Sequence, residues 1–307
     1  MTLNPRDTRT ALPPAPLLPT QVRNVILHLR LPIELTLAPL YLWGVFGAGG
    51  RLTTATVTGF LALHLFLYGG TTLFNSYYDR DDGPIMGMEH PVSLPRWALP
   101  FSLAWQAVGG LIAATVSLPF VLFYLAYAVA GVLYSHPRPR LKRRPFTSAL
   151  LVLVFQGLGG FVAGWLASTR ASVPVDDARF LAMGLVAACT TLGLYPLTQV
   201  FQVDEDAARG DRTLAMVLGP SGSFIFAVGA FAVAAPLALW VLLARGRPLD
   251  GALMAVGYAL MGAATLVVGR RFAQTSLIVN FRRLAALQYT ASGAFGLFMV
   301  LQVVRLW

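Results

Sequence analysis

Two short stretches of the chain hold most of its acidic residues. Eight of the thirteen Asp and Glu residues lie within residues 79–89 and 204–211. The first stretch is part of NSYYDRDDGPI, residues 75 to 85. Successive helical residues are rotated by about 100°, so a helix that continues through this stretch places Asn75, Asp79 and Asp82 on one face. Asp81 is then expected to point to water.

The second stretch has a similar arrangement. Four side chains fall on one face of the helix expected there: Tyr195, Gln199, Gln202 and Asp206. Carboxylate and amide oxygens without nearby His or Cys suit Mg²⁺, which takes one or two carboxylates together with substrate phosphates. Solvated acids that balance neighbouring arginines are the simpler alternative. Two stretches that each present an amide and an acid on one face favour the metal site.

A basic loop lies between two of the apolar segments. LYSHPRPRLKRRPF, residues 133 to 146, contains Lys142, the only lysine of the chain. A lysine ammonium is a compact charge that binds phosphate. The alternative is that Lys142 is a membrane-flanking anchor. Arg30, near the first apolar segment, is a functional candidate because ionisable residues at membrane depth are costly. Arg30 as an interfacial anchor and a simple i,i+4 pair with Glu34 are the alternatives.

The elements that carry these residues are predicted to be membrane helices. The chain is 56% hydrophobic and 12% charged, whereas a soluble domain carries about 25% charged residues. Stretches of about 17 to 25 apolar residues can cross a bilayer, and nine occur at 24–48, 52–74, 97–117, 119–134, 147–168, 179–200, 223–244, 251–269 and 284–306. We therefore expect an all-α, polytopic membrane bundle of about nine transmembrane helices around a central cavity. The fourth stretch is short for a full span.

The domain organisation follows from the same pattern. Residues 1–22 are Pro-rich and are expected to be a disordered cytoplasmic tail, and residues 23–307 a single transmembrane domain. Cys189 is the only cysteine, which excludes a disulfide framework and a thiolate metal site. Small residues in GGLIAA and QGLGGFVAG are expected to let helices pack closely.

The basic residues predict the orientation of the chain. With the N-terminus inside, 17 of the 23 Lys and Arg residues lie on the side of the two acidic stretches, as the positive-inside rule requires. We expect a multi-pass protein of the cell membrane with its N-terminus and acidic loops in the cytoplasm. The net charge of +10 is explained by topology rather than by nucleic acid, because the basic runs sit between apolar segments. No obligate protein partner is predicted.

NSYYDRDDGPI followed by VDEDAARGDRTLAMVLG resembles the paired signatures of the UbiA superfamily of intramembrane prenyltransferases. That family pairs an NDxxDxxxD-like motif after its second helix with a DxxxD-like motif after its sixth. Asn75, Asp79 and Asp206 match, and Gly210 stands where the second motif continues into a glycine. The chain departs from the pattern at Ser76, Gly83 and Gln202, which replace acidic residues. The resemblance covers about residues 24 to 306.

The resemblance implies a Mg²⁺-dependent transfer of a prenyl group from a polyprenyl diphosphate to a hydrophobic or aromatic acceptor, such as a quinone precursor, inside the membrane. The metal ligands would be Asn75, Asp79, Asp82, Gln202 and Asp206. The catalytic residues would be Asp79, Asp206 and Lys142. The substrates would be bound by Arg30, Asn75, Tyr134, Lys142, Arg143, Tyr195, Gln199, Gln202 and Arg209.

Two questions stay open at this point. A multi-pass transporter of a lipid or small solute, without prenyl transfer, is the alternative function, and it predicts charged sites near the bilayer midplane. The acids of this chain instead lie at predicted helix ends. The sequence also presents no general base that would activate the acceptor.

Overall fold

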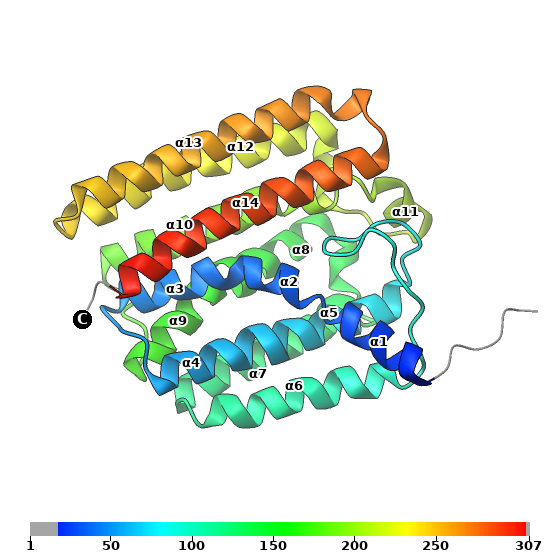
Figure 1. Cartoon of the computed structure of the whole chain (residues 1–307), viewed down its shortest axis with the longest axis horizontal. Helices are drawn as coiled ribbons and strands as arrows, with labels where there is room; N and C mark the ends of the chain where they lie inside the picture. The colour runs from blue at the N-terminus through cyan, green and yellow to red at the C-terminus, as the bar shows by residue number, and fades with distance from the viewer. Residues whose placement is uncertain (1–17, 305–307) are drawn as a thin grey trace, which may run out of the picture.

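The computed structural model describes residues 18–304 and shows a bundle of α-helices with no β-strand in that range (Figure 1). This confirms the predicted fold class. The α-helices are α1 (Leu18–His28), α2 (Leu31–Glu34), α3 (Ala38–Gly47), α4 (Thr54–Leu61), α5 (Gly69–Asp79), α6 (Ala98–Ala114), α7 (Leu118–Ser135), α8 (Pro145–Leu151), α9 (Gly159–Thr169), α10 (Ala178–Leu194), α11 (Val203–Ala208), α12 (Leu214–Ala244), α13 (Pro248–Arg271) and α14 (Leu277–Val304). π-Helical turns Ala62–Tyr68 and Val152–Leu158 join α4 to α5 and α8 to α9.

The boundary of the expected N-terminal tail differs from the structure. Residues 1–17 lie outside the described range, and residues 18–22 form the first part of α1. Val25 and Leu29 are buried against Leu73 and Ala98. These contacts anchor the segment that begins at Leu18 as a helix.

Eight helical segments of the described chain are long and apolar enough to cross a membrane: Leu18–Gly47, Thr54–Asp79, Leu118–Ser135, Pro145–Thr169, Ala178–Thr198, Leu214–Ala244, Pro248–Gln274 and Leu277–Val304. A ninth apolar helix, α6, has 17 residues and α7 has 18, so the shortest segment is the third and not the fourth. The start of α1 and the end of α14 lie at opposite ends of the bundle (Figure 1). An odd number of passages accounts for that arrangement.

Two glycines let α3 and α9 pack with their backbones in contact. A Cβ atom on Gly44 would lie 1.9 Å from the carbonyl oxygen of Phe161, and one on Gly164 would lie 1.9 Å from that of Tyr41. Only glycine permits such an approach, so the expectation that QGLGGFVAG supports close helix packing is confirmed for Gly164. The Trp43 indole beside this contact is fully buried and donates to the carbonyl of Met183.

The helix ends next to the acidic stretches differ from the prediction. α5 ends at Asp79 because Arg80 adopts a left-handed conformation with φ of 51°. The sixth span breaks after α10, and α11 follows as a separate short helix. The connection between the apolar stretches expected at 179–200 and 223–244 is shortened, because α12 begins at Leu214. Gly219, with φ of 67°, interrupts α12 near its start.

The segment between α5 and α6, residues 80–97, folds over the end of the bundle where the two acidic stretches lie. Asn24 and His28 of α1 hydrogen-bond to the carbonyls of Ser93 and Val92. These contacts hold the segment against α1.

Candidate functional site

A cavity of about 710 Å³ enters the bundle at the end where both acidic stretches lie. Charged and amide side chains from α5, α11 and the adjoining loops line its polar end. The rest is lined largely by apolar residues of α3, α8, α13 and α14 and by the π-helical turn Val152–Leu158. Both acidic stretches therefore face one shared chamber.

The first acidic stretch contributes Asp79 and Asp81 to the cavity wall, but not Asp82. Asp82 is exposed, and its backbone N–H donates to Glu205 Oε1 at 2.9 Å. The expectation that Asp82 shares a face with Asn75 and Asp79 is wrong, because the helix ends before it. The left-handed Arg80 turns Asp81 inward instead, and the Asp81 side chain is only 6% exposed.

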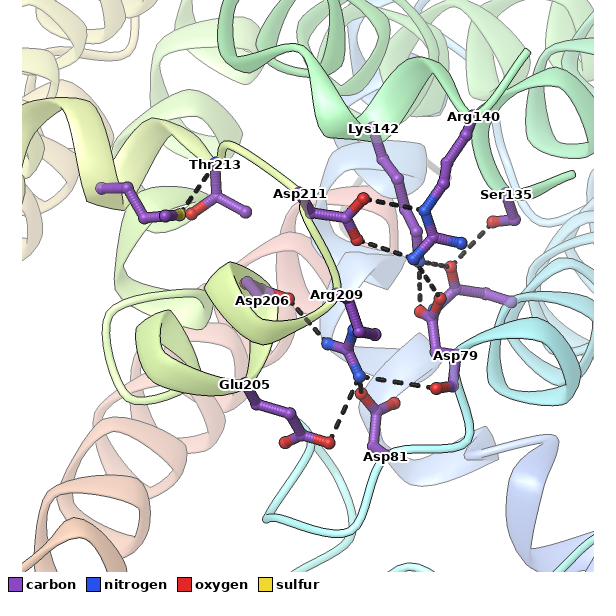
Figure 2. A network of polar contacts seen from close by, with 12 residues as sticks. Asp79, Asp81, Ser135, Arg140, Lys142, Glu205, Asp206, Arg209, Asp211 and Thr213 are labelled. Atoms are coloured by element: carbon purple, nitrogen blue, oxygen red, sulfur yellow. Dashed lines mark hydrogen bonds and ion pairs between the residues drawn. The ribbon is translucent and has the colours of Figure 1, made fainter. Parts of the chain in front are cut away.

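Lys142 lies against the first stretch, as Figure 2 shows. Its ammonium donates to Asn75 Oδ1 at 2.9 Å and forms an ion pair with Asp79. The Ser135 hydroxyl donates to the same Asn75 oxygen at 2.7 Å. Lys142 is 11% exposed, so it belongs to the cavity wall rather than to the outer surface of the basic loop.

Arg209 joins the two stretches (Figure 2). Its guanidinium lies 2.6 Å from Asp81, 2.7 Å from Asp206 and 3.2 Å from Glu205. Burial opposes the charge of this guanidinium, but Asp81, Asp206 and Asp79 together raise its pKa. The Arg209 guanidinium thus bridges acids of both stretches at the polar end of the cavity.

Sequence reasoning missed Arg140 and Asp211. Arg140 binds Asp211 through two bonds of 2.7 Å and reaches Asp79 at 3.3 Å. Asp211 is buried and lines the cavity. Both residues lie in the stretches that the sequence analysis singled out, but their pairing joins loops 71 positions apart, which helical spacing cannot predict.

The other predicted residues divide into two groups. The cavity wall contains Arg30, Asn75, Tyr134, Tyr195, Gln199, Gln202 and Asp206. The hydroxyls of Tyr134 and Tyr195 are 3.1 Å apart. Arg143 is exposed and is not part of the wall, because its side chain lies on the outer surface of the loop while Lys142 points inward.

The donor set at the polar end fits Mg²⁺ bound jointly with a substrate. Within residues 18–304, no three His, Cys, Asp or Glu side chains converge to hold a metal ion by themselves. Mg²⁺ usually takes one or two carboxylates, with water and phosphate oxygens as its other ligands. Burial raises the pKa of Asp206, and burial and the charge of Asp79 raise the pKa of Asp81. Both carboxyls therefore gain from a nearby cation.

Further along the cavity wall lies a second set of polar groups. Glu34 is 8% exposed, and its Oε1 accepts a hydrogen bond of 2.5 Å from the Thr72 hydroxyl. Gln288 of α14 donates to Thr36 at 3.1 Å. The alternative of an ion pair between Arg30 and Glu34 is not found: within the described part of the chain, Arg30 instead donates to the carbonyl of Met86 at 3.1 Å.

The apolar part of the cavity reaches the outer face of the bundle. Its wall includes Leu253 and Leu260 of α13, which are 52% and 66% exposed, and exposed Thr290 and Ala294 of α14. The cavity thus opens sideways between α13 and α14, through a surface of the kind that contacts lipid.

A model of the UbiA prenyltransferase family matches residues 37–304 of the chain. A digeranylgeranylglyceryl phosphate synthase from Natronomonas pharaonis is 29% identical over 226 residues, which is 70% of this chain and 76% of that protein. A protoheme IX farnesyltransferase from Aeropyrum pernix is 31% identical over 118 residues, 36% of this chain and 37% of that protein.

Solved structures share the fold. A UbiA homolog from Archaeoglobus fulgidus bound to DMAPP and Mg²⁺ superimposes with a TM-score of 0.66 at 22% identity, over 89% of this chain and 98% of that chain. The apo structure of a UbiA homolog from Aeropyrum pernix K1 gives 0.60 at 19% identity, over 90% and 98%.

Proposed function

The chain belongs to the UbiA prenyltransferase family, and from this premise we propose that it transfers a prenyl group from a polyprenyl diphosphate to an acceptor within the membrane, with Mg²⁺. One observation carries the proposal: both acidic stretches and Lys142 meet at the polar end of a cavity whose remaining wall is largely apolar. A diphosphate fits the polar end, and a hydrocarbon chain fits the apolar part. Family membership favours this enzyme over the alternative of a transporter.

We assign the cation to Asn75, Asp79, Asp81, Gln202 and Asp206. Asp81 takes the place expected for Asp82, because Asp81 lines the cavity. When bound, Mg²⁺ would neutralise charge on the diphosphate and so make it a better leaving group. Lys142 and Arg209 already contact these carboxylates and can donate to phosphate oxygens from the same positions.

The wall beyond the polar end would protect the prenyl carbon from water. Tyr134 and Tyr195 line the cavity with their hydroxyls paired, and aromatic faces attract a developing allylic cation. Tyr77 and Tyr78, which lie within the first acidic stretch NSYYDRDDGPI, do not line the cavity.

The chemical identity of the acceptor is a separate part of the proposal. An aromatic or quinone precursor is the acceptor expected from the sequence, and this stays a prediction. The relatives are named for unlike compounds, digeranylgeranylglyceryl phosphate as a product and protoheme IX as the group that is farnesylated. The expected sidedness, with the acidic loops in the cytoplasm, is likewise proposed from the basic residues.

A product screen tests the function. The purified protein is incubated with Mg²⁺, farnesyl and geranylgeranyl diphosphates and a membrane lipid extract, and prenylated products are identified by mass spectrometry. We expect a prenylated lipid or aromatic compound with Mg²⁺ and none with EDTA. A folded protein that consumes no prenyl diphosphate in the presence of Mg²⁺ would contradict the proposal.

A further inference from the structure

Glu34 is a buried carboxylate that the function proposed above does not use. It lies in the segment Leu18–Gly47, which is long and apolar enough to cross a membrane, and it lines the cavity. Burial of a carboxylate at such depth costs free energy unless hydrogen bonds or a nearby charge compensate for it. Its hydrogen bond from Thr72 Oγ1 uses one oxygen, and within residues 18–304 no cation lies within 4 Å of the other. An ionisable residue buried at membrane depth is a candidate for a functional role.

The neighbours of Glu34 place it inward of the proposed diphosphate site. Thr72 lies three residues before Asn75 and seven before Asp79 on α5. A helix rises about 1.5 Å per residue, so Thr72 sits about 5 Å inward from Asn75 and about 10 Å inward from Asp79 along the axis. A diphosphate held at Asn75 and Asp79 directs its prenyl C1 inward, toward the level of Thr72 and Glu34.

Arg30 forms no ion pair with this carboxylate within 4 Å, although the two charges attract each other at longer range. Its guanidinium donates to the carbonyl of Met86, in the segment that covers the end of the bundle. Met86 and Arg30 both line the cavity on the side of the polar end. Glu34 faces α5 instead, so an acceptor group that enters the cavity can reach its free oxygen.

We propose that Glu34 is the general base of the transfer, held in place by Thr72, and that the acceptor nucleophile is a hydroxyl group. This rests on the proposed function. The C1–O bond of the prenyl diphosphate breaks, and its electron pair leaves with the diphosphate. The acceptor oxygen forms the new bond to C1, and its proton passes to the Glu34 carboxylate. A hydroxyl fits because it can donate a hydrogen bond to the carboxylate before it reacts, whereas an aromatic C–H cannot. A hydroxyl acceptor therefore departs from the sequence-based prediction wherever that prediction implies prenylation at an aromatic carbon.

The test separates transfer from ionisation of the donor. Geranylgeranyl diphosphate labelled at C1 is incubated with Mg²⁺ and a membrane lipid extract, and the label is followed into lipid and into prenyl alcohol, the product of capture by water. Glu34→Gln keeps the shape and can still accept from Thr72. We expect its transfer to lipid to fall by about 100-fold or more, as for loss of a general base. The KM for the donor and the rate of alcohol formation should stay unchanged.

Three further variants define the role. Glu34→Asp should recover part of the lost transfer, because it restores the carboxylate. Thr72→Val removes the positioning hydrogen bond and should lower kcat without raising the KM for the donor. Glu89→Gln is the matched control, since Glu89 lies on the surface and pairs with Arg282, and it should transfer as the unchanged protein does.

The outcomes distinguish the two proposals. Equal transfer by Glu34→Gln and the unchanged protein would refute the role of Glu34 and leave the proposed function standing. A parallel loss of lipid and alcohol products in Glu34→Gln would also refute it, because the defect would then lie in donor binding or folding. If the unchanged protein released no diphosphate with Mg²⁺, both proposals would fall.

Discussion

At the scale of single residues, the site is decided by which of two neighbours points inward. Asp81 and Asp82 are adjacent and chemically identical, yet Asp81 lines the cavity and Asp82 is exposed. Lys142 and Arg143 are adjacent cations with the same division. In each pair, substitution of the outward-facing residue is therefore the control for substitution of its inward-facing neighbour.

Asp81→Asn should lower Mg²⁺-dependent turnover strongly, and Asp82→Asn should leave it nearly unchanged. The first removes a charge from the proposed cation site and from the Arg209 contact, whereas the second changes a side chain in solvent. Loss of one preorganised charged group costs about 100-fold in kcat. Turnover as a function of Mg²⁺ concentration measures both. A stronger loss in Asp82→Asn than in Asp81→Asn would show that the cation is bound elsewhere.

Lys142→Ala should raise the KM for the prenyl diphosphate and lower kcat, by about 100-fold in kcat/KM together. Arg143→Ala should keep both constants, because its side chain is outside the cavity. Steady-state kinetics with varied donor gives the comparison. Equal effects of the two substitutions would mean that Lys142 serves the orientation of the loop and not the substrate.

The sequence predicts which stretches carry the chemistry but not every contact within them. Helical spacing correctly predicts that Gln199, Gln202 and Asp206 reach one wall, although the helix is in fact broken between them. The same reasoning fails at Asp82, since it assumes a helix that Arg80 ends. The bonds between Arg140 and Asp211 join two loops, and no local pattern encodes them.

At the scale of elements, the close packing of α3 against α9 fixes a helix that lines the cavity. Gly44 and Gly164 set this distance. α3 follows Arg30 and Glu34 in the first span and also lines the cavity through Leu40. Hydropathy predicts where these helices lie, and small residues predict that they pack closely, but neither gives the facing partner.

Gly164→Ala should destabilise the protein, because its methyl group would overlap the carbonyl oxygen of Tyr41. Overpacking of a tight contact costs about 1–3 kcal/mol. Gly229→Ala on α12 is the control, since nothing lies within 4 Å of the added methyl. Thermal unfolding in detergent should give a lower midpoint for Gly164→Ala only. An unchanged midpoint would show that α3 and α9 separate without penalty.

At the scale of the whole molecule, the arrangement of the helices gives two distinct ends. The acidic stretches and the segment of residues 80–97 lie at one end, and the loop after α9 lies at the other (Figure 1). From the distribution of basic residues we propose that the acidic end faces the cytoplasm.

Single-cysteine labelling tests this orientation. In a Cys189→Ser background, Asp82→Cys and Ser172→Cys place one thiol at each end, and both positions are exposed. With intact cells, a membrane-impermeant maleimide should label Ser172→Cys, while Asp82→Cys should react only after the membrane is permeabilised. The reverse pattern would place the acidic end outside the cell.

The sideways opening between α13 and α14 determines in which units the concentration of a lipid substrate must be expressed. A lipid that arrives through it is supplied from the plane of the bilayer, so its effective concentration is its mole fraction among the surrounding lipids and not its amount per volume of buffer. Extra phospholipid at fixed amounts of protein and substrates therefore slows turnover by dilution in two dimensions, whereas extra buffer leaves that supply unaltered.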